Sequence, residues 1–522
     1  MDRPQPALTL ARAVDLLGGC GLLREVIAGG TWTLDADDVD GDRDPIGAVT
    51  YDTRRVGPRS MLFIKGRFEP RYLDGVDDRG LAAYVAETSY ADHTRAPGII
   101  VNDVRRAMSL LAAEFYGRPQ EDLTLIGITG TKGKTTTAYF TQAILNAHSH
   151  GRAALLSSVD NCLDGRTYRE SELTTPESLD LFRMMRDAAD NGMRYLIMEV
   201  SSQAYKVERV YGLTFDVGAF LNISPDHISP IEHPTFEDYL YCKRRITANS
   251  RALVLGADCQ HADLIAQDAR AARIPTTTFA LHDNHHHTPA TITATEDPHD
   301  GMLFSVEERD RPVGSYRLAM HGAFNRENAV AAIALALAAG ILPTDPALSA
   351  IETVQVPGRM EKIEGADGLV GYVDFAHNYA STKALVREIR REYANRNPRI
   401  ILVSGSTGGK ALDRRRGIVA GALGGVESFV FTTDDPDFED PGSIALEMLS
   451  HVSDPHAQAR IVIPREEAIE AAVADARSHP ERFNIILVIG KGSEKHNIVR
   501  GRSVPFAGDA TVLARALGAA DR

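Results

Sequence analysis

The feature that most constrains the fold is a series of short apolar runs that end abruptly in small or polar residues. The runs lie at 123–130, 194–202, 216–224, 251–258, 368–377, 399–406, 428–435 and 484–492. They are rich in Val, Ile and Leu and alternate with helical patterns, which is typical of buried parallel strands in doubly wound sheets. Ligands of such sheets bind beyond the carboxyl ends of the strands, so we expect the functional residues there.

The length and the distribution of these runs predict three domains. A chain of 522 residues holds about three domains at roughly 150 residues each. The first part has shorter apolar runs and reads as a smaller α/β domain, while Pro357 and Gly358 interrupt a helical pattern further on. We place the domains at 1–121, 122–356 and 357–522. The predicted fold class is α/β, with a doubly wound central sheet and a Rossmann-like C-terminal sheet.

Charge and composition exclude several classes of protein. The net charge of −14 makes an electrostatic partner for nucleic acid or an anionic membrane unexpected. No apolar stretch approaches the ~18 residues of a membrane-spanning helix, and the N-terminus lacks the pattern of a secretory signal. The four cysteines form no CxxC pair, which fits a reducing compartment. We therefore expect a cytoplasmic protein without membrane insertion.

The segment 126–137, "IGITGTKGKTTT", predicts a nucleotide phosphate loop at a strand-to-helix junction. Gly130 and Gly133 would let backbone N–H groups face an anion, Lys134 would reach the β- and γ-phosphates, and Thr135 would offer a hydroxyl to Mg²⁺. The strict P-loop pattern fails at its first glycine, where this chain has Ile128. The predicted ATP-binding loop comprises Gly130, Thr131, Lys132, Gly133, Lys134, Thr135 and Thr136.

Two further strand ends carry candidate metal ligands. Glu199 ends the apolar run at 194–202, where its carboxylate suits Mg²⁺, and His227 follows the next run. Because Mg²⁺ prefers oxygen ligands, a histidine indicates a second and less usual metal position. Tyr239 and Lys243 lie four residues apart on one predicted helix face. The histidine-rich segment 282–289 is interpreted as a solvated loop, because its histidines lack the spacing of a metal site.

The ordered set of motifs resembles the Mur ligase family, the ATP-dependent amino-acid ligases of peptidoglycan synthesis. The matching segments are "DTRR", "GTKGKTTT", "LTTPESLDL", "EVSSQAY", "NISPDHI", "YLYCK", "GAFNRENAVAA", "VPGRME", "VDFAHN" and "GKGSE", between Asp52 and Glu494. They run through all three predicted domains in the family's order. "LTTPESLDL" and "GKGSE" favour the members that add the third residue of the stem peptide.

The resemblance implies roles for the central residues. Lys134 and Thr135 would serve ATP and its Mg²⁺, Glu199 a first metal ion and His227 a second. Lys243 would be carried as a carbamate (N6-carboxylysine), because an ammonium would repel Mg²⁺ whereas a carbamate offers it anionic oxygen. The implied catalytic residues are Lys134, Lys243 and His227. The residues implied to hold the ATP base, phosphates and ribose are Asn325, Asn328, Arg359 and Asp374, with His377 in the same motif.

The resemblance also implies the substrates and the reaction. UDP-MurNAc-L-Ala-D-Glu would be phosphorylated by ATP on its terminal carboxylate, and the amine of an amino acid would then displace phosphate from the acyl phosphate. The implied contacts to the UDP-sugar dipeptide are Asp52, Thr53, Arg54, Thr174, Thr175, Ser201 and Arg209. Thr53 replaces the serine of the family's "DSR" segment and keeps the hydroxyl. Gln203 stands where many relatives have histidine, and its role stays open.

The stretch at 429–441 packs five acidic residues into seven positions. A solvated acidic turn is the simplest interpretation. By the resemblance, however, residues 434–437 fall where members that add meso-diaminopimelate carry Asp-Asn-Pro-Arg, whose Arg holds the distal carboxylate. Asp437 stands in place of that Arg, which implies a basic amino acid, L-lysine first and L-ornithine second. The implied amino-acid-binding residues are Arg415, Asp434, Asp435, Asp437, Gly490 and Glu494, with Arg415 matching weakly.

Several alternatives stay open at this point. The same ligase could use L-ornithine or meso-diaminopimelate, or the chain could be the member that adds D-Ala-D-Ala. A folylpolyglutamate synthetase would lack the N-terminal block that contains "DTRR". A nucleotide switch or motor would leave Lys243, His227 and the C-terminal sheet without a function.

Overall fold

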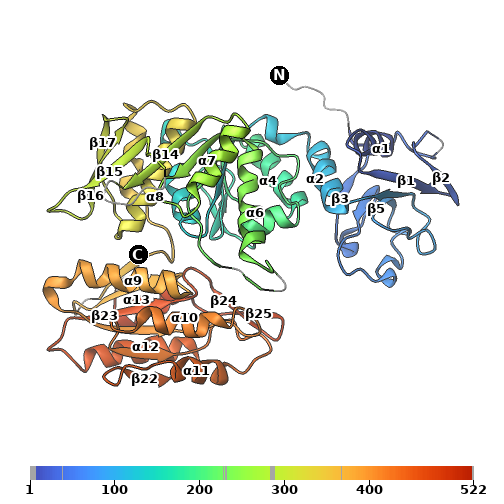
Figure 1. Ribbon diagram of the computed structural model, residues 1–522. Helices are drawn as coiled ribbons and strands as arrows, with labels where there is room; N and C mark the ends of the chain where they lie inside the picture. The colour runs from blue at the N-terminus through green and yellow to red at the C-terminus, as the bar shows by residue number, and fades with distance from the viewer. Residues whose placement is uncertain are drawn as a thin grey trace.

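Three main sheets follow one another along the chain in the computed structural model, which describes residues 7–37, 39–226, 228–229, 232–281, 288–365 and 367–519. Figure 1 shows the N-terminal part in blue, the central part from cyan to yellow, and the C-terminal part in orange and red. The domain limits that we place at 121/122 and 356/357 fall between these sheets.

The N-terminal sheet has six strands in the order β2-β1-β6-β5-β4-β3. The strands from β3 to β6 are parallel, whereas β1 is antiparallel to both of its neighbours. Its elements are α1 (Leu10–Gly19), β1 (Leu23–Ala28), β2 (Thr31–Thr33), β3 (Ala48–Thr50), β4 (Ser60–Phe63), β5 (Leu81–Ala86), β6 (Gly98–Val101) and α2 (Val104–Phe115).

The central sheet has eleven strands in the order β10-β9-β8-β11-β7-β12-β13-β14-β15-β16-β17, of which those from β8 to β15 in this order are parallel. The strands are β7 (Thr124–Thr129), β8 (Ala153–Leu156), β9 (Asp160–Cys162), β10 (Tyr168–Glu170), β11 (Tyr195–Glu199), β12 (Phe215–Phe220), β13 (Ser250–Gly256), β14 (Thr276–Leu281), β15 (Ile292–Glu296), β16 (Leu303–Glu308) and β17 (Arg311–Arg317). The α-helices are α3 (Lys134–His148), α4 (Ser178–Asp190), α5 (Ser202–Lys206), α6 (Phe236–Ala248), α7 (Ala262–Ala271) and α8 (Ala323–Ala338).

The C-terminal sheet has the order β18-β19-β23-β20-β21-β22, with only β18 antiparallel to its neighbour. A separate hairpin of β24 and β25 follows it. The elements are β18 (Glu361–Glu364), β19 (Val370–Asp374), α9 (Tyr379–Glu392), β20 (Arg399–Ser404), α10 (Asp413–Ala422), β21 (Ser428–Phe431), α11 (Pro441–Ser450), β22 (Gln458–Ile461), α12 (Arg465–Arg477), β23 (Asn484–Ile489), β24 (His496–Val499), β25 (Arg502–Pro505) and α13 (Asp509–Leu517).

Burial on both faces explains why these strands are continuously apolar. All residues of β20 are buried, and Leu402 packs in a different core cluster from its neighbours Ile401 and Val403. Because successive side chains of a strand point to opposite faces, each face of the sheet has its own core. All the apolar runs that we predicted as parallel strands contain one, so the α/β fold class is confirmed.

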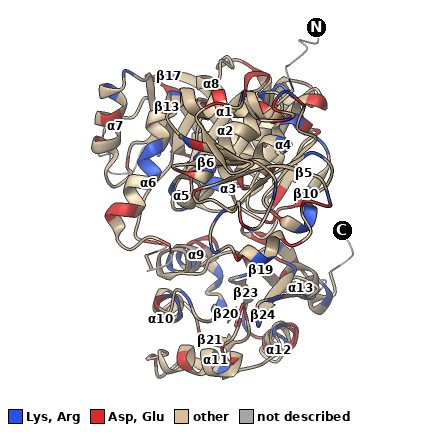
Figure 2. Cartoon of the chain, turned by 90° about the vertical axis from the view of Figure 1, so that its right-hand side faces the viewer, with Lys and Arg blue, Asp and Glu red and all other residues tan. Residues whose placement is uncertain are grey.

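Charged residues are mixed over all three parts of the chain, as Figure 2 shows. Lys and Arg lie beside Asp and Glu on most of the helices in this view. No helix in the described ranges is both long and apolar enough to cross a membrane.

Candidate active site

The phosphate loop lies at the carboxyl end of β7, and α3 begins at Lys134 directly after it. Gly133 has a φ of 84°, and a Cβ atom there would lie 2.2 Å from the Asn328 side-chain oxygen, so only glycine fits. The Lys134 Nζ donates to the carbonyl oxygens of Gly130 (3.0 Å) and Thr131 (3.4 Å). Burial of this ammonium lowers its pKa. The lysine is thus folded over its own loop, where a phosphate would offer a better partner.

Thr135 and Glu199 meet at Ser158, a residue that the sequence reasoning missed. The Thr135 hydroxyl lies 3.0 Å from the Ser158 hydroxyl, and the Glu199 carboxylate accepts the Ser158 N–H at 2.7 Å. Glu199 is 1% exposed at the end of β11. Ser158 follows β8, whose apolar run Ala153–Leu156 was the signal that could have found it. A hydroxyl and a carboxylate are oxygen ligands of the kind that Mg²⁺ prefers.

Lys243 projects from α6 into the same loop. Its Nζ donates to the Gly130 carbonyl oxygen (2.8 Å) and the Thr129 hydroxyl (3.4 Å), and it lies over the Tyr239 ring. The residue is 2% exposed, and burial, helped by the Lys134 charge, holds the pKa of Lys243 well below its usual value. The charges of Asp226 and Glu199 oppose this shift without outweighing the burial. A lowered pKa favours the neutral, nucleophilic amine that carbamate formation with CO₂ requires.

His227 lies outside the described residues, so its predicted place at a second metal stays a prediction. Its neighbour Asp226 connects the central and C-terminal parts of the chain. The Asp226 carboxylate accepts from the ammonium of Lys132 (3.3 Å) and the side-chain amide of Asn378 (3.2 Å), and it pairs with Arg414 at 3.5 Å. The segment 282–287 also lies outside the described residues.

A second group of potential metal ligands lies nearby but is already used internally. His233, Asp238 and Cys242 place one donor atom each within 4.8 Å of the others. One ring nitrogen of His233 contacts Asp238 at 2.6 Å and the other contacts the Ser202 hydroxyl at 2.9 Å. Because both nitrogens have partners, this group ties α6 to α5 rather than leaving a nitrogen for a metal ion.

Of the residues predicted for the ATP base, phosphates and ribose, Asn328 and Arg359 contact the phosphate loop or the first turn of α3. Asn325 donates to the His321 carbonyl at 2.7 Å, and Asn328 lies against Gly133. Arg359 comes from the C-terminal part, stacks on Phe375 and reaches the Thr135 hydroxyl at 3.4 Å. The Asp374 carboxylate accepts the N–H groups of Met360 and Ala376, both at 2.8 Å.

The residues predicted for the UDP-sugar dipeptide fall into two groups. Thr175, Ser201 and Arg209 converge: the Thr175 hydroxyl donates to the Glu199 carbonyl (2.9 Å) and accepts the Ser201 N–H (3.0 Å), and Arg209 donates to the Thr175 carbonyl (3.0 Å). Thr174 is adjacent in the chain. Asp52, Thr53 and Arg54 lie apart in the N-terminal domain, where Arg54 bonds Asp52 through two nitrogens and holds its pKa at about 2.

Two ion pairs join these groups through Glu177, which the sequence reasoning did not single out. Its carboxylate lies 2.6 Å from the Lys65 ammonium of the N-terminal domain and 2.7 Å from the Arg209 guanidinium. Tyr51, beside Asp52, donates to the Asp180 carboxylate at 2.6 Å. The N-terminal domain is therefore fastened to the central domain next to the predicted dipeptide site.

The acidic loop after β21 and the glycine loop after β23 form an ionic cluster. Lys491, another residue that we did not predict, has a fully buried side chain and contacts Glu494 (2.6 Å), Asp435 (2.8 Å) and Asp434 (3.7 Å). Gly490 has a φ of 111°, and a Cβ atom there would lie 2.7 Å from an Asp434 carboxylate oxygen. Burial raises the pKa of both Asp434 and Glu494, while Lys491 opposes the shift.

Two predicted amino-acid-binding residues have internal partners. The Asp437 carboxylate accepts the Gly501 N–H at 2.7 Å, which anchors the loop to the β24–β25 turn. Arg415 is 3% exposed, and its guanidinium pairs with Glu439 (2.6 Å) and Glu447 (2.5 Å). To bind a substrate carboxylate, Arg415 would have to exchange one of these glutamates, so its predicted role stays a prediction.

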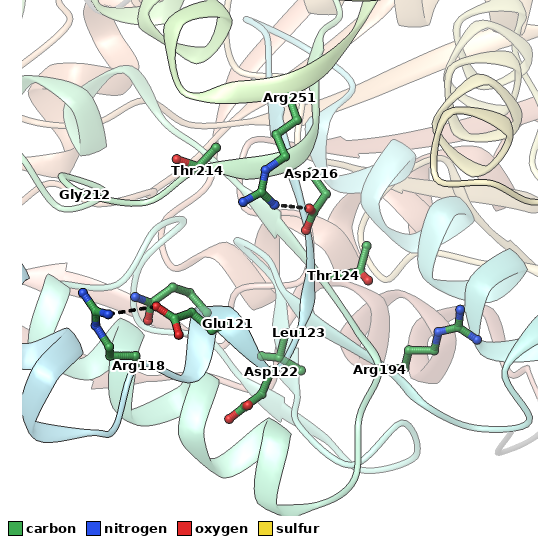
Figure 3. Close-up of a pocket in the computed structure, with 11 residues that line it drawn as sticks. Arg118, Glu121, Asp122, Leu123, Thr124, Arg194, Gly212, Thr214, Asp216 and Arg251 are labelled. Atoms are coloured by element: carbon green, nitrogen blue, oxygen red, sulfur yellow. Dashed lines mark hydrogen bonds and ion pairs between the residues drawn. The ribbon is translucent and has the colours of Figure 1, made fainter. Parts of the chain in front are cut away.

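A cavity of about 580 Å³ lies at the opposite edge of the central sheet (Figure 3). Thr124, Asp216 and Arg251 line it at the start of β7, β12 and β13, with Arg118 and Glu121 from the segment before β7. Arg251 pairs there with Asp216. None of the predicted site residues reaches this edge, so we assign the active site to the carboxyl ends of the strands.

The fold and the loop define a P-loop nucleotide-binding protein with an added C-terminal α/β domain. Residues 128–336 match the family model described as "Mur ligase middle domain", and residues 358–492 match "Mur ligase, glutamate ligase domain". The chain is 55% identical to the UDP-N-acetylmuramyl-tripeptide synthetase of Bifidobacterium longum, over 98% of this chain and 100% of the relative. It belongs to the Mur ligase family.

Two further comparisons agree with this assignment. A relative in Enterococcus faecalis, UDP-N-acetylmuramoyl-L-alanyl-D-glutamate–L-lysine ligase, is 41% identical over 94% of each chain. The solved structure of a UDP-N-acetylmuramoyl-L-alanyl-D-glutamate–2,6-diaminopimelate ligase has a TM-score of 0.63 at 23% identity, covering 92% of this chain and 96% of that one. This last similarity concerns the fold alone.

Proposed function

We propose that the protein is an ATP-dependent ligase that adds the third amino acid, L-lysine, to UDP-MurNAc-L-Ala-D-Glu in peptidoglycan synthesis. The observation that carries this proposal is the full-length similarity to a tripeptide synthetase and to an L-lysine ligase. The phosphate loop and the acidic cluster provide the two halves of the chemistry that such a ligase needs. Membership of the same family keeps an ornithine-adding or diaminopimelate-adding ligase as the nearest alternatives.

The first half-reaction transfers the γ-phosphoryl group of ATP to the terminal carboxylate of the dipeptide. Lys134 would leave the Gly130 and Thr131 carbonyls and neutralise the charge that develops on the phosphates. Arg359, which already reaches Thr135 from the C-terminal domain, would add a second positive charge. Asn325 and Asn328 would border the nucleotide base, and Asp374 the ribose.

Thr135, Glu199 and a carbamate on Lys243 are the oxygen donors proposed to hold Mg²⁺, with His227 as a nitrogen donor. When bound, Mg²⁺ would neutralise the phosphate charges and orient the acceptor carboxylate. The donor set fits, because the Thr135 hydroxyl and the Glu199 carboxylate, both oxygen donors, contact the same residue, Ser158. Lys134 and Lys243 both donate to the Gly130 carbonyl. Two ammonium groups on one carbonyl repel each other, which favours a neutral Lys243 amine and hence its carbamate.

The second half-reaction joins the amine of the incoming amino acid to the acyl phosphate. The amine attacks the carbonyl carbon, the tetrahedral intermediate expels phosphate, and the amine loses a proton to the solvent. The protein contributes mainly position and charge to this step. Asp434 is the cluster carboxylate proposed to bind the substrate ammonium, because its contact with Lys491, at 3.7 Å, is the longest of the three.

Phosphate release from ATP tests the proposal. We expect release only when UDP-MurNAc-L-Ala-D-Glu and L-lysine are both present, with the tripeptide product seen by mass spectrometry. Release that needs UDP-MurNAc-tripeptide and D-Ala-D-Ala instead would identify a different member of the family. Release without any UDP-sugar peptide would favour a nucleotide switch.

A further inference from the structure

The hairpin of β1 and β2 in the N-terminal domain exposes two large apolar side chains. Trp32 is 77% exposed and Leu34 is 71% exposed, and Trp32 is the only tryptophan of the 522 residues. Trp32 lies opposite the partly buried Ile27 in the strand ladder, so their side chains share one face of the hairpin. Because tryptophan is prominent among the residues that dominate protein–protein contacts, this hairpin is a candidate contact surface.

The strand that carries Trp32 lies at the edge of its sheet. In the described chain β2 pairs with β1 and with no other strand, so one side of β2 can accept a further strand. Figure 1 shows the hairpin at the end of the N-terminal part that points away from the central part. The candidate active site lies between the central and C-terminal parts. A partner could therefore pair with β2 without covering the active site.

The loop that follows β2 is strongly acidic. Residues 35–44 contain six aspartates and one arginine. Four of the described aspartates are exposed to solvent: Asp35, Asp37, Asp40 and Asp44. Arg43 pairs with Asp42 at 3.7 Å, and Arg59 from outside the loop pairs with Asp44 at 3.1 Å. These two cations leave the loop with an excess of negative charge beside Trp32.

The acidic loop is held in place by its own apolar residues and backbone. Its buried side chains lie in the core cluster that includes α1: Ala36, Val39 and Ile46. The Ala11 N–H donates to the Asp42 carbonyl at 2.9 Å, and the Ile46 N–H donates to the Leu8 carbonyl at 2.7 Å. A surface that is ordered before binding loses little conformational entropy when a partner arrives. The aspartates are thus held ready beside Trp32.

We propose that Trp32, Leu34 and the exposed aspartates Asp35, Asp37 and Asp40, together called the hairpin surface, bind a segment of another protein that alternates basic and apolar side chains. The segment would add a strand beside β2, pack its apolar side chains on Trp32 and Leu34, and bring cations to the aspartates. This inference goes beyond the proposed ligase function and does not depend on it.

Charge argues against two other occupants of the hairpin surface. A second copy of this chain would bring two acidic loops together, and the whole chain carries a net charge of −14. An anionic membrane would be repelled by the same aspartates. A basic segment is the occupant whose charge complements the loop.

The single tryptophan makes docking directly measurable. The probe is a synthetic peptide of about ten residues that alternates lysine and valine, because valine favours strands. We expect a saturable blue shift in the fluorescence of Trp32 when the peptide is added to the full chain. Peptides that alternate glutamate with valine, or lysine with serine, should bind at least about tenfold more weakly. Added salt should weaken the binding of the lysine–valine peptide by screening the charges.

Charge variants test the acidic part of the hairpin surface. Asp35→Asn, Asp37→Asn and Asp40→Asn in one chain should weaken binding of the lysine–valine peptide at least about tenfold. The matched control removes three charges from exposed positions of the central and C-terminal parts: Glu307→Gln, Glu467→Gln and Glu481→Gln. In this control the affinity should stay within about twofold.

A further variant tests the apolar part of the hairpin surface. Trp32→Ser removes the fluorophore, so calorimetry measures its affinity for the lysine–valine peptide. Binding should be at least about tenfold weaker than in the wild type. Because all the substituted side chains are exposed, circular dichroism should be the same in every variant.

The possible outcomes separate the occupants. If the lysine–valine peptide leaves the fluorescence of Trp32 unchanged, or binds the triple asparagine variant as well as the wild type, the hairpin surface is not a docking site for a basic segment. A dimer in sedimentation that Trp32→Ser dissociates would identify a second copy as the occupant and overturn the proposal. Binding of the wild type to phosphatidylglycerol vesicles, lost in Trp32→Ser, would overturn it in favour of a membrane.

Discussion

The phosphate loop and the acidic cluster gather buried charges of opposite sign. Around the loop, the Lys134 ammonium lies over the Gly130 carbonyl and the Arg359 guanidinium reaches the Thr135 hydroxyl, where the phosphates of ATP would bring negative charge. In the cluster, three carboxylates crowd around Lys491 and await a cation. Buried like charges are costly unless a counter-charge arrives, so each region is completed by its substrate. We therefore expect substitutions at the phosphate loop to change ATP chemistry, and substitutions in the acidic cluster to change the choice of amino acid.

The largest expected effect is beside the phosphate loop, at Lys243. Lys243→Ala removes the proposed carbamate, so ligation should fall by ~10³-fold, the scale of losing a preorganised charge contact. The fold and ATP binding should be kept, and an added small carboxylate should restore part of the activity. Steady-state rates with and without acetate check this, with Lys383→Ala, at an exposed position of α9, as the control. Full activity in Lys243→Ala would rule out the carbamate.

A smaller loss is expected at the other lysine of the loop. Lys134→Ala removes the charge that faces the β- and γ-phosphates, so formation of the acyl phosphate should slow by at least ~10²-fold. Rapid-quench measurement of ADP in a single turnover isolates this step from amino-acid binding. Near-normal turnover would mean that the loop does not hold the phosphates in the way proposed.

On the anionic side, Asp434→Asn should change binding rather than rate. Removing this charge should raise the KM for lysine about tenfold, equivalent to about 1.4 kcal/mol, with little change in kcat. Norleucine, which lacks the side-chain ammonium, serves as the comparison, because its use should not depend on Asp434. An equal rise in KM for lysine and norleucine would show that Asp434 stabilises the loop and does not bind the side-chain ammonium of the substrate.

The smallest expected effect is a dependence of the KM for lysine on pH. Burial raises the pKa of Asp434 and of Glu494, so both lose their charge at a higher pH than an exposed carboxyl would. The KM for lysine should therefore rise about threefold as the pH is lowered, and the rise should begin above the ordinary carboxyl range of about 4, because protonation removes the attraction. Glu494→Gln should weaken the dependence of KM on pH. A KM that does not change with pH in the wild type would contradict the role of these two carboxyl groups.

The sequence allowed the strands and the strand-to-helix junction at Gly133 to be predicted, because their signals are local, while the binding roles of the loop and of Glu199 stay predictions. A strand-to-helix junction with Gly133, Lys134 and Thr135 has few uses other than nucleotide binding, and Glu199 ends a fully apolar run. The resemblance added roles for residues such as Arg359, whose contact with Thr135 joins two domains.

What could not be predicted depends on which loops meet in space. Lys491 lies inside a recognised motif, yet nothing local indicates that its ammonium is surrounded by carboxylates from two strand ends. The partners of Arg415 come from a different helix and loop. The same limit applied to Asp437, whose turn contact with Gly501 arises only when the hairpin folds back.

The Glu177 bridge has a consequence for the size of the substrate. With Lys65 and Arg209 on one carboxylate, the N-terminal and central domains are held at a set separation. A UDP-sugar peptide bound at the predicted Asp52 site would have to span that separation before its last carboxylate reached the phosphate loop. The two ion pairs would thus set the length of peptide that fits: a UDP-sugar with a shorter peptide would fall short of ATP, and a longer one would extend past it.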